Sequence, residues 1–557
     1  MTAKHPLYLV SLTVAVTGHR DIAPADEERT RTLVQSRFGE LQRQCPATPI
    51  MVLSGLAEGA DMVCADAALD LGIEVVPILP SPPEVFAKDF ERPAHGDRDP
   101  EELAQRFRTL LERCAAPIVV AESLTADEPR RYALVGAYLA RHCHILFALW
   151  DEVENDVEGG TSHVVQLVRG GVSERYLDEP KRALDAPEPR PIHHLAVPRF
   201  GETPSRLWAW SLLQVSAAEQ KHSQGVLVAL DCFNADAATF AANHPQAITK
   251  SLAWFDADAT ALSRVERRAL EVFAAADAFA ISLRNSSHQS LKTIFVIGWL
   301  MVAAFEVYSN IWGLPSVLGL YIVGLLAAAA IYFLDRSRKT YTRFLDYRGL
   351  AEGLRVQIFY HLAGLPILAA DHYLRKQRGE LTWIRQAMRA LDVGPRRSAP
   401  RFDLVKKYWI DDQASYFNSA SRRDRLTFNR NKRWALGFFI SGLVVAGAGF
   451  GIEMATGGKL HDALWMHLLI AMMGFLPATA AALTGYTDRR GLGQHIKQYE
   501  RMQEVYGRAA SIATSLEEAT DPESCKRLAA ELGKEALAEN ADWILLHRER
   551  PIDLPNR

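Results

Sequence analysis

The chain has 557 residues, more than one hydrophobic core normally supports, and this length suggests two to four folding units. Its formal net charge of -3 gives no overall basic field for nucleic acid, so we expect no nucleic-acid partner. The six cysteines are scattered without CxxC spacing, which favours reduced thiols over a zinc site.

Short apolar segments alternate with helical patterns between residues 12 and 200. Such alternation is typical of a parallel sheet covered by helices on both faces. Residues 1–200 are therefore predicted to form an α/β Rossmann-like, ligand-binding domain. We expect strands at residues 12–16, 50–54, 74–79, 117–121, 144–150 and 192–197, and helices at residues 24–44, 59–71, 100–114, 132–142 and after Thr161.

Glycines and polar residues gather where three of these strands end. Ligands of parallel sheets bind outside the carboxyl ends of the strands, where free N–H groups at helix N-termini attract phosphate. Arg20 would add a bidentate phosphate contact. The predicted ligand-binding residues are Thr17, Gly18, His19 and Arg20 after the first strand, Ser54, Gly55, Glu58, Gly59 and Asp61 after the second, and Asp151, Gly159, Gly160 and Thr161 after the fifth.

Each of these features also has a plainer interpretation. Glycines at strand-to-helix turns often serve close packing alone. Glu58 and Asp61 would suit carboxylate catalysis, whereas Asp61 would equally suit a cap for the helix that follows. The histidines at 142 and 144 and at 193 and 194 lack neighbouring carboxylates or cysteines at metal-ligand spacing, so we expect core or rim residues there and no metal site.

The motifs VTGHR at 16–20, SGLAEGAD at 54–61 and GGT at 159–161, in this order, resemble the SLOG superfamily. That superfamily includes the lonely-guy phosphoribohydrolases, the DNA-processing protein A fold and the N-terminal regions of melastatin channels. The resemblance covers residues 10–200 and implies a nucleotide or nucleotide-derived ligand, with no other cofactor. The lonely-guy motif PGGxGTxxE is not matched, because this chain has EGGTSHVV. A ligand sensor is thus favoured over a hydrolase.

Four nearly uncharged runs follow a less readable stretch, residues 201–260, that we interpret as a linker or small insertion. Each run approaches the ~20 residues needed to cross a bilayer, and they pair into two hairpins. Buried helices of a large soluble protein are the alternative. We predict an all-α membrane domain with four transmembrane helices and cytoplasmic helical arms, embedded in the lipid bilayer. The expected spans are residues 293–310, 315–334, 434–454 and 464–486.

Positive charges flank the four spans on one side only. Arginines and lysines precede the first and third spans and follow the second and fourth, whereas the two hairpin turns carry only Lys459. The positive-inside rule then puts both turns outside and both termini in the cytoplasm. We expect a multi-pass protein of the bacterial inner membrane.

Two acidic residues occupy matching positions near the outer ends of the first and third spans. Glu306 and Glu453 would favour cations at a pore mouth, or would simply reach interfacial water. The glycines of the third span give it a small-residue face for packing or for lining a pore. One hairpin encloses no pore, so conduction requires a homo-oligomer. These glycines are Gly442, Gly447, Gly449 and Gly451.

Segments beside the spans carry a second resemblance. FLDYRGLAEGLRVQIFYHLAGL at 344–365 and WIDDQASYFNSASRRDR at 409–425 are similar to SLATT-type two-helix membrane effectors, with coverage of about residues 260–515. The resemblance implies one unit at residues 261–400 and a second at 401–557 that includes the C-terminal helices. SLATT effectors partner SLOG modules in bacterial conflict and anti-phage systems, and the family is associated with pores.

Together the two resemblances imply a membrane effector of anti-phage or conflict defence. Its cytoplasmic SLOG domain would sense a nucleotide-derived signal and gate an oligomeric pore. The alternatives are a membrane-tethered nucleotide or nucleoside hydrolase that uses Glu58 or Asp61, and a non-conducting membrane scaffold.

Overall fold

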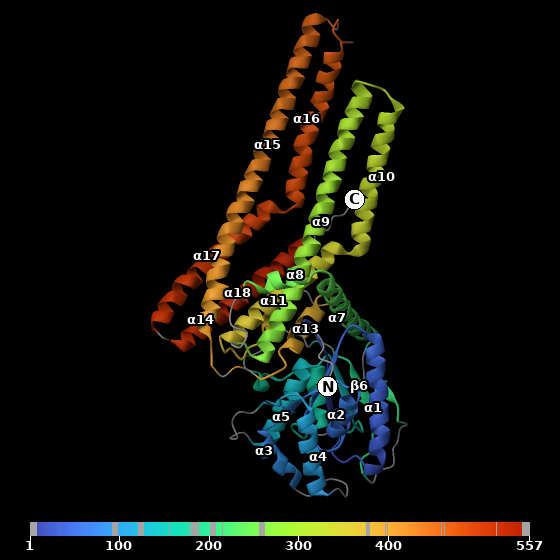
Figure 1. Ribbon diagram of the computed structural model, residues 1–557, viewed down its shortest axis with the longest axis vertical. Helices are drawn as coiled ribbons and strands as arrows, with labels where there is room; N and C mark the ends of the chain where they lie inside the picture. The colour runs from blue at the N-terminus through green and yellow to red at the C-terminus, as the bar shows by residue number, and fades with distance from the viewer. Residues whose placement is uncertain are drawn as a thin grey trace. The chain divides into compact units, whose positions relative to one another are not determined.

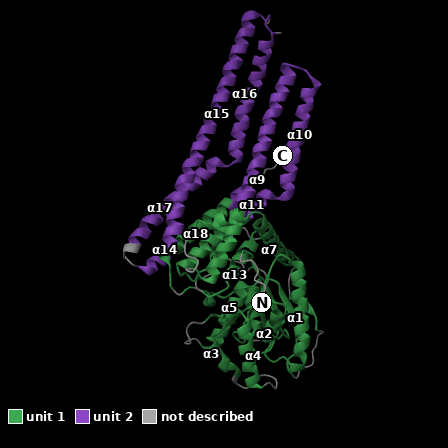
Figure 2. Ribbon diagram, in the orientation of Figure 1, with its two compact units in different colours: residues 1–278, 347–402, 529–543 green, residues 279–346, 403–528, 544–557 purple. Residues whose placement is uncertain are grey.

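The computed structural model divides into two compact units that each combine separate stretches of the chain (Figure 2). Unit 1 contains residues 1–278, 347–402 and 529–543, and unit 2 contains residues 279–346, 403–528 and 544–557. The structure describes residues 8–91, 99–120, 127–154, 156–177, 179, 188, 190–200, 208–213, 216–255, 262–374, 379–395, 397, 399–457, 459–461, 463–519 and 521–548. This division differs from the predicted boundaries at residues 200, 260 and 400.

Unit 1 contains a seven-stranded sheet with the strand order β4-β3-β2-β1-β5-β6-β7. Figure 1 draws the strands as arrows and labels β6. Every neighbouring pair is parallel except β6 and β7, which are antiparallel. The six predicted strands are confirmed, and β7 is an additional edge strand. The strands are β1 (Leu12–Gly18), β2 (Ile50–Ser54), β3 (Glu74–Leu79), β4 (Ile118–Val119), β5 (Ile145–Leu149), β6 (Ile192–Leu195) and β7 (Trp210–Leu212).

Helices cover both faces of this sheet because strand residues alternate between two apolar cores. Val14 and Val52 belong to the core shared with α1, α2 and α4, whereas Ala15 and Leu53 belong to the core shared with α5 and α6. The helices of these two layers are α1 (Pro24–Gln44), α2 (Ala60–Asp70), α3 (Pro83–Phe86), η1 (Ala87–Glu91), α4 (Pro100–Arg113), α5 (Glu128–His142), α6 (Thr161–Gly170) and η2 (Glu174–Tyr176).

The stretch expected to be a linker or small insertion instead contains two helices, α7 (Ala217–Asn243) and α8 (Pro245–Leu252). Ser216 and Glu219 form a capping box that starts α7. Asn234 is fully buried, accepts a hydrogen bond from the Val10 N–H and donates to the Val10 carbonyl. Polar side chains thus hold α7 against the chain that leads into β1.

A helical layer completes unit 1 with residues that lie far apart in the sequence. All ten residues of α13 are buried, including the charged Arg385 and Arg389. The segment 341–365, expected to be one of the cytoplasmic amphipathic arms, forms α11 up to residue 362, and most of its residues are buried. The helices of this layer are α11 (Thr340–Leu362), α12 (Ala369–His372), α13 (Thr382–Leu391) and α18 (Pro522–Arg548).

Unit 2 consists mainly of two helical hairpins. The first hairpin pairs α9 (Arg264–Asn310) with α10 (Pro315–Arg338), and the second pairs α15 (Asp412–Thr456) with α16 (Leu464–Arg489). The hairpins contact each other, because the Trp299 indole of α9 donates to Thr479 Oγ1 of α16 at 2.9 Å. The remaining elements are α14 (Phe402–Val405), the π-helical turn η4 (Lys406–Asp411) and α17 (Leu492–Ala519).

Within the described part of the chain, five helical stretches are long and apolar enough to cross a membrane. Four coincide with the predicted spans, and the fifth is α7, which was not expected to qualify. None of the most apolar part of α10 is buried, and Leu320 and Leu326 are each 65% exposed. Exposed apolar surface on this scale requires a partner or a membrane. The five stretches are Ala217–Asn243, Arg264–Asn310, Pro315–Leu362, Phe402–Thr456 and Leu464–Leu516.

Candidate functional site

The strand order reverses between β1 and β5, which makes their carboxyl ends the topological switch point of the sheet. β1 pairs with β2 on one side and with β5 on the other, and Gly18 lies opposite Leu149 in the register. The loops after β1 and β5 therefore leave the sheet side by side. The crevice between such diverging loops is where open α/β sheets bind ligands.

His19 fastens the β1 loop to the β5 loop. Its side chain is buried, and its Nε2 accepts the backbone N–H of Asp151 at 2.9 Å. Since Nε2 is the acceptor, the ring is neutral and carries its proton on Nδ1. Burial lowers the pKa of His19, although the nearby carboxylate of Asp151 opposes this shift. His19 is therefore a neutral ring that holds the β5 loop in position.

Asp151 is held by a residue that the sequence did not single out. Arg199 Nε donates to Asp151 Oδ2 at 2.8 Å, and the Val153 N–H donates to Oδ1 at 3.0 Å. Burial works to raise the pKa of Asp151, but the Arg199 and Val153 hydrogen bonds outweigh burial and lower it. Arg199 follows β6, and nothing in its local sequence signals this ion pair.

The β2 loop is closed by the buried carboxylate of Asp61. This carboxylate accepts hydrogen bonds from the backbone N–H groups of Ala57 and Gly55, so Asp61 bridges from the first turn of α2 back to the loop. Burial raises the pKa of Asp61 to about 7, against these hydrogen bonds and the charge of Arg20. Asp61 does not cap α2, because Gly59 is the N-cap and no side-chain capping hydrogen bond forms there. Its contacts hold the loop in place, while its pKa lies in the range of an acid–base group.

Gly59 joins the β2 loop to the β1 loop. A Cβ at Gly59 would lie 2.4 Å from the His19 carbonyl oxygen, and the φ of +80° is strained for any other residue. The next N–H, that of Ala60, donates to this same oxygen at 2.9 Å. Gly18 is equally confined, because a Cβ there would lie 2.4 Å from Ala60 Cβ. Close packing accounts for both glycines.

Tyr132 of α5 brings the third loop to the same edge. A Cβ at Gly159 would lie 2.6 Å from Tyr132 Cβ, and Gly159 has a φ of +83°. The Arg20 guanidinium lies over the Tyr132 ring, 4.8 Å from its centroid. Burial raises the pKa of Tyr132 to about 12, and its hydroxyl donates to Asp89 at 2.7 Å. Tyr132 was not among the residues predicted from the sequence to lie at the ligand site.

The remaining predicted residues differ in exposure. Thr17, Ser54 and Glu58 are buried; the Ser54 hydroxyl accepts the Leu56 N–H at 3.1 Å and donates to the Asp61 carbonyl. Gly160 and Thr161 are half-buried at the start of α6, whose N-cap Gly160 makes no side-chain capping hydrogen bond.

Arg20 is exposed, so this edge presents a cation, an aromatic ring and the N-terminus of α6. The Gly160 N–H already donates to the Val157 carbonyl at 3.1 Å and the Gly159 N–H to His163 Nδ1 at 3.0 Å, so the guanidinium is the group of this edge that best suits a phosphate.

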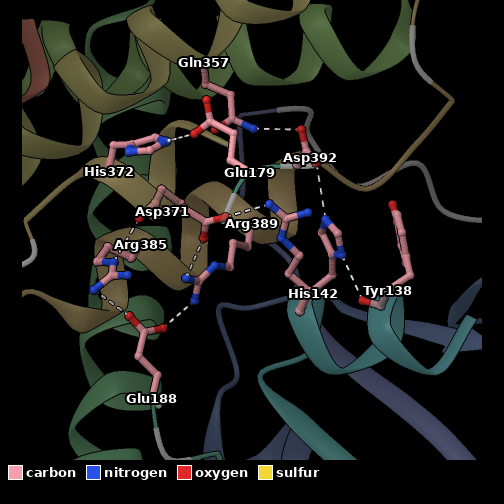
Figure 3. A network of polar contacts seen from close by, with 12 residues as sticks. Tyr138, His142, Glu179, Glu188, Gln357, Asp371, His372, Arg385, Arg389 and Asp392 are labelled. Carbon is pink, nitrogen blue, oxygen red and sulfur yellow. Dashed lines mark hydrogen bonds and ion pairs between the residues drawn. The ribbon is translucent and has the colours of Figure 1, made fainter. Parts of the chain in front are cut away.

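The histidines at 142 and 144 lie at the opposite edge, where β5 begins. His144 Nδ1 accepts from the Thr13 backbone N–H at 3.1 Å. His142 Nε2 lies 3.2 Å from Asp392, the residue that follows α13 (Figure 3). The other carboxylate oxygen of Asp392 lies 2.5 Å from His361 of α11. Within the described residues, no group of three or more His, Cys, Asp or Glu could hold a metal ion.

The same buried region contains a charged network that joins α13 to neighbouring segments (Figure 3). Arg389 pairs with Asp371 at 3.0 Å and with Glu188, and Arg385 pairs with Glu188 at 2.7 Å. Arg141 of α5 pairs with Asp371 at 2.6 Å. The network therefore fastens the sheet domain to the helical layer of unit 1.

On β6, His193 and His194 point to opposite faces. His193 Nδ1 accepts from Arg37 Nε at 3.1 Å and stacks on Phe147, whereas His194 Nε2 lies 2.7 Å from the Trp150 carbonyl. Both rings are engaged by the surrounding protein.

Glu306 and Glu453 have different surroundings despite their matching positions in the sequence. Glu306 packs against Gly474 of the other hairpin and accepts a hydrogen bond from Asn310 at 2.9 Å. Glu453 lies 3.1 Å from His461 in the turn of its own hairpin. The two carboxylates thus do not occupy equivalent places within unit 2.

Neither known protein families nor curated protein sequences give a match to this chain. Its function is therefore argued from the geometry of the switch point and from the surface of the hairpins.

Proposed function

We propose that the protein is a bacterial inner-membrane effector whose Rossmann-like domain senses a nucleotide-derived ligand and gates an oligomeric transmembrane pore. The observation that carries the proposal is the meeting of three loops at the β1–β5 switch point, joined to a chain with long apolar hairpins. The resemblance of its motifs to the SLOG and SLATT families supports the proposal, and from that resemblance we propose a role in anti-phage or conflict defence.

The membrane anchor consists of four helices in this proposal: α9, α10, α15 and α16. Their apolar side chains face outwards, as Phe450 and Met454 do at 70% exposure each. We exclude α7 because it holds Asp231 and Asn234 in hydrogen bonds to residues 47–48 and Val10. Charged and amide groups used in this way belong to a soluble core. Both hairpin turns then lie outside and both termini in the cytoplasm.

The ligand is a nucleotide or a nucleotide-derived molecule. In our proposal its phosphate binds at the N-terminus of α6, at Gly160 and Thr161, with a charge-assisted contact from Arg20. The exposed side of the Arg20 guanidinium is a planar cation. Together with the adjoining loops, it contacts the base or the sugar phosphate in this proposal. Gly18, Gly59 and Gly159 act indirectly, by letting the three loops approach one another.

Coupling between the domains requires that the ligand binds the open state more tightly than the closed one. The candidate element is α9, since its first residues belong to unit 1 and its apolar part to unit 2. Glu306 lies in the apolar part of α9 and contacts Gly474 of the neighbouring hairpin. A shift of α9 would therefore change both the position of this carboxylate and the contact between hairpins.

The experiment uses the purified full-length chain in liposomes that contain an ion-sensitive dye, exposed to a pool of cellular nucleotides. We expect nucleotide-dependent ion flux together with a ligand-induced rise in the thermal unfolding midpoint. Arg20→Ala should lose both signals, whereas Arg113→Ala, an exposed arginine of α4, should keep them. A wild-type protein that shows neither flux nor a thermal shift would overturn the proposal.

A second candidate is a membrane-tethered nucleotide or nucleoside hydrolase. The raised pKa of Asp61, about 7, supports this alternative because acid–base groups work best near the operating pH. Nucleotide turnover by the full-length protein that disappears in Asp61→Asn would favour the hydrolase. Flux without turnover would favour the sensor.

A further inference from the structure

Helix α15 carries an arginine-rich stripe immediately before its apolar part. Two adjoining grooves run along this stripe; the first is lined by Arg430, Arg433, Trp434 and Gly437, and the second by Arg422 and Arg423. At 100° per residue, Leu426, Arg430, Arg433 and Gly437 fall on one face of the helix. The same face continues through Ile440 and Val444, which are 50% and 64% exposed.

The opposite side of α15 makes the contacts within unit 2. Gly442 and Gly449 pack on α16, and Asn431 donates to Thr487 of α16 at 3.1 Å. Arg425 pairs with Glu500 of α17. The arginine stripe therefore points away from the helices that cover α15.

Arg423 of the stripe lies 3.7 Å from Asp424, but the other three arginines have no acidic partner among the described residues. Arg422, Arg430 and Arg433 are exposed, and none forms an ion pair with another described residue. Exposed arginines without partners remain available to an outside anion. Gly437 adds open space, because a Cβ there would meet no atom within 4 Å.

We propose that this stripe binds the headgroup of an anionic phospholipid. Arg430 and Arg433 hold the phosphodiester, the exposed Trp434 ring lies at the level of the headgroups, and an acyl chain follows Gly437, Ile440 and Val444. Basic residues beside a span attract anionic lipids in this way, and aromatic rings favour the interface. The inference rests on the proposed membrane anchor, because it places residue 434 at the membrane surface.

The proposed site lies on one face of α15, whereas a general attraction of positive charges to an anionic membrane has no preferred face. Lys432 is as exposed as its neighbours but lies roughly half a turn round the helix from Arg430. A general attraction to the anionic surface would use Lys432 as much as Arg430. A bound lipid on the stripe uses Arg430 and Arg433 only.

The test measures lipid binding to the delipidated full-length protein in detergent, by native mass spectrometry. Phosphatidylglycerol and phosphatidylcholine with identical acyl chains are titrated separately. We expect tighter binding of phosphatidylglycerol, an affinity about fivefold lower in Arg430→Gln, and a further loss of about fivefold in the double variant with Arg433→Gln. Lys432→Gln, the matched control, should leave the affinity unchanged.

Three results would overturn the lipid site: equal affinity for the two lipids, equal loss in Lys432→Gln and Arg430→Gln, or displacement of bound phosphatidylglycerol by inorganic phosphate at the same concentration. Flotation of the wild-type protein with phosphatidylcholine vesicles separates the site from the anchor. Failure to float contradicts the proposed membrane function, whereas flotation without lipid preference contradicts only the site.

Discussion

Gly59 holds two loops of the switch point together because its position leaves no room for a side chain. Its φ of +80° and the nearby carbonyl oxygens of His19 and Arg20, 2.4 and 2.5 Å from a Cβ, combine strain with a clash against backbone. Strain at such a position costs about 1–3 kcal/mol, and backbone oxygens cannot move aside as a flexible side chain does. The close packing of the loops after β1 and β2 therefore requires a residue without a Cβ at position 59.

We predict that Gly59→Ala lowers the thermal unfolding midpoint of the full-length protein far more than Gly72→Ala. Gly72 also has a positive φ, +71°, but a Cβ there meets no atom within 4 Å. Gly72→Ala should therefore cost about 1 kcal/mol, and Gly59→Ala about 3 kcal/mol or more. Differential scanning fluorimetry of both variants measures the difference, and equal midpoints would mean that the two loops do not meet at Gly59.

Asp61 should make stability depend on pH in the neutral range. Its folded pKa is about 7 and its ordinary value is 3.8, so between these values the folded protein holds a proton that the unfolded chain has lost. The stabilising effect is complete below about pH 4 and is lost as the pH rises through about 7. Asp61→Asn cannot lose a proton, so its stability lacks this contribution to the pH dependence.

Unfolding midpoints measured from pH 4.5 to 7.5 test this assignment. The midpoint of the wild type minus that of Asp61→Asn should fall steadily over this range. The midpoint of the wild type minus that of Asp70→Asn should stay constant. Hydrogen bonds from Arg31 lower the pKa of Asp70, so this carboxyl is ionised over the whole range in both the folded and the unfolded protein. A constant difference for Asp61→Asn would contradict the raised pKa.

At the scale of elements, the buried position of α13 depends on ion pairs that cannot be predicted from the sequence of the helix itself. Arg389 is 8% exposed at its side chain and pairs with both Glu188 and Asp371. Burial opposes ionisation of Glu188, but the charges of Arg389, Arg385 and Arg190 lower its pKa to about 2. The carboxylate therefore stays ionised inside unit 1.

Removing Arg389 should destabilise the protein strongly. Arg389→Gln leaves the two carboxylates without their shared cation, and breaking a buried pair costs about 3–5 kcal/mol. The control is Arg113→Gln, which breaks pairs with Asp66 and Asp70 at a side chain that is 42% exposed and should cost less than about 1 kcal/mol. Limited proteolysis of the two variants, followed at residues 347–402, gives the readout; equal protection would contradict a structural role for the network.

The strands could be predicted from sequence because each is a short apolar run bounded by turn residues. β2 and β3 match the expected bounds to the residue, since the apolar runs IMVLS and EVVPIL predict a strand without information from the rest of the chain. α13 could not be predicted as core, because Arg385 and Arg389 are buried beside acidic partners outside the helix: Glu188, about 200 positions away, and Asp371. β7 has three residues, too few for an alternating pattern.

The candidate site was predictable to a similar degree. Glycines, His19 and Asp151 stand out because loops after parallel strands share one edge. Tyr132 and Arg199 did not, because their roles depend on the side chains opposite them in space.

The structure also separates the four glycines of the third span, which the sequence pattern treats alike. Gly442 and Gly449 lie against α16, whereas Gly447 and Gly451 face open space.

This separation predicts opposite outcomes for two similar substitutions in α15. A Cβ at Gly449 would lie 2.6 Å from Leu469 Cδ2, so Gly449→Val should push α15 and α16 apart. Gly447→Val should be tolerated. The yield of monodisperse protein in detergent and its unfolding midpoint distinguish the two, and loss in Gly447→Val alone would instead place that face in a contact between subunits.

At the scale of the whole molecule, the two units interleave along the chain. Unit 1 needs residues 347–402 and 529–543, which come after the first and second hairpins in the sequence. Residues 1–200 alone would lack α7, which holds Val10, and Asp392, which follows α13 and lies beside His142. Experiments on the ligand site therefore require the full-length chain.

The proposed topology gives the last prediction, and it is tested with cysteines introduced one at a time into the native chain in intact cells. Gly313→Cys and Lys459→Cys lie in the two hairpin turns, and Ser337→Cys lies just after the second span; all three positions are exposed. If both turns face outside, a membrane-impermeant maleimide labels the first two in intact cells and Ser337→Cys only after permeabilisation. The exposed native Cys232 is an internal control, because a cytoplasmic α7 keeps it unlabelled until the membrane is opened. Labelling of Cys232 in intact cells would contradict the proposed orientation, and labelling of only one turn would contradict the paired hairpins.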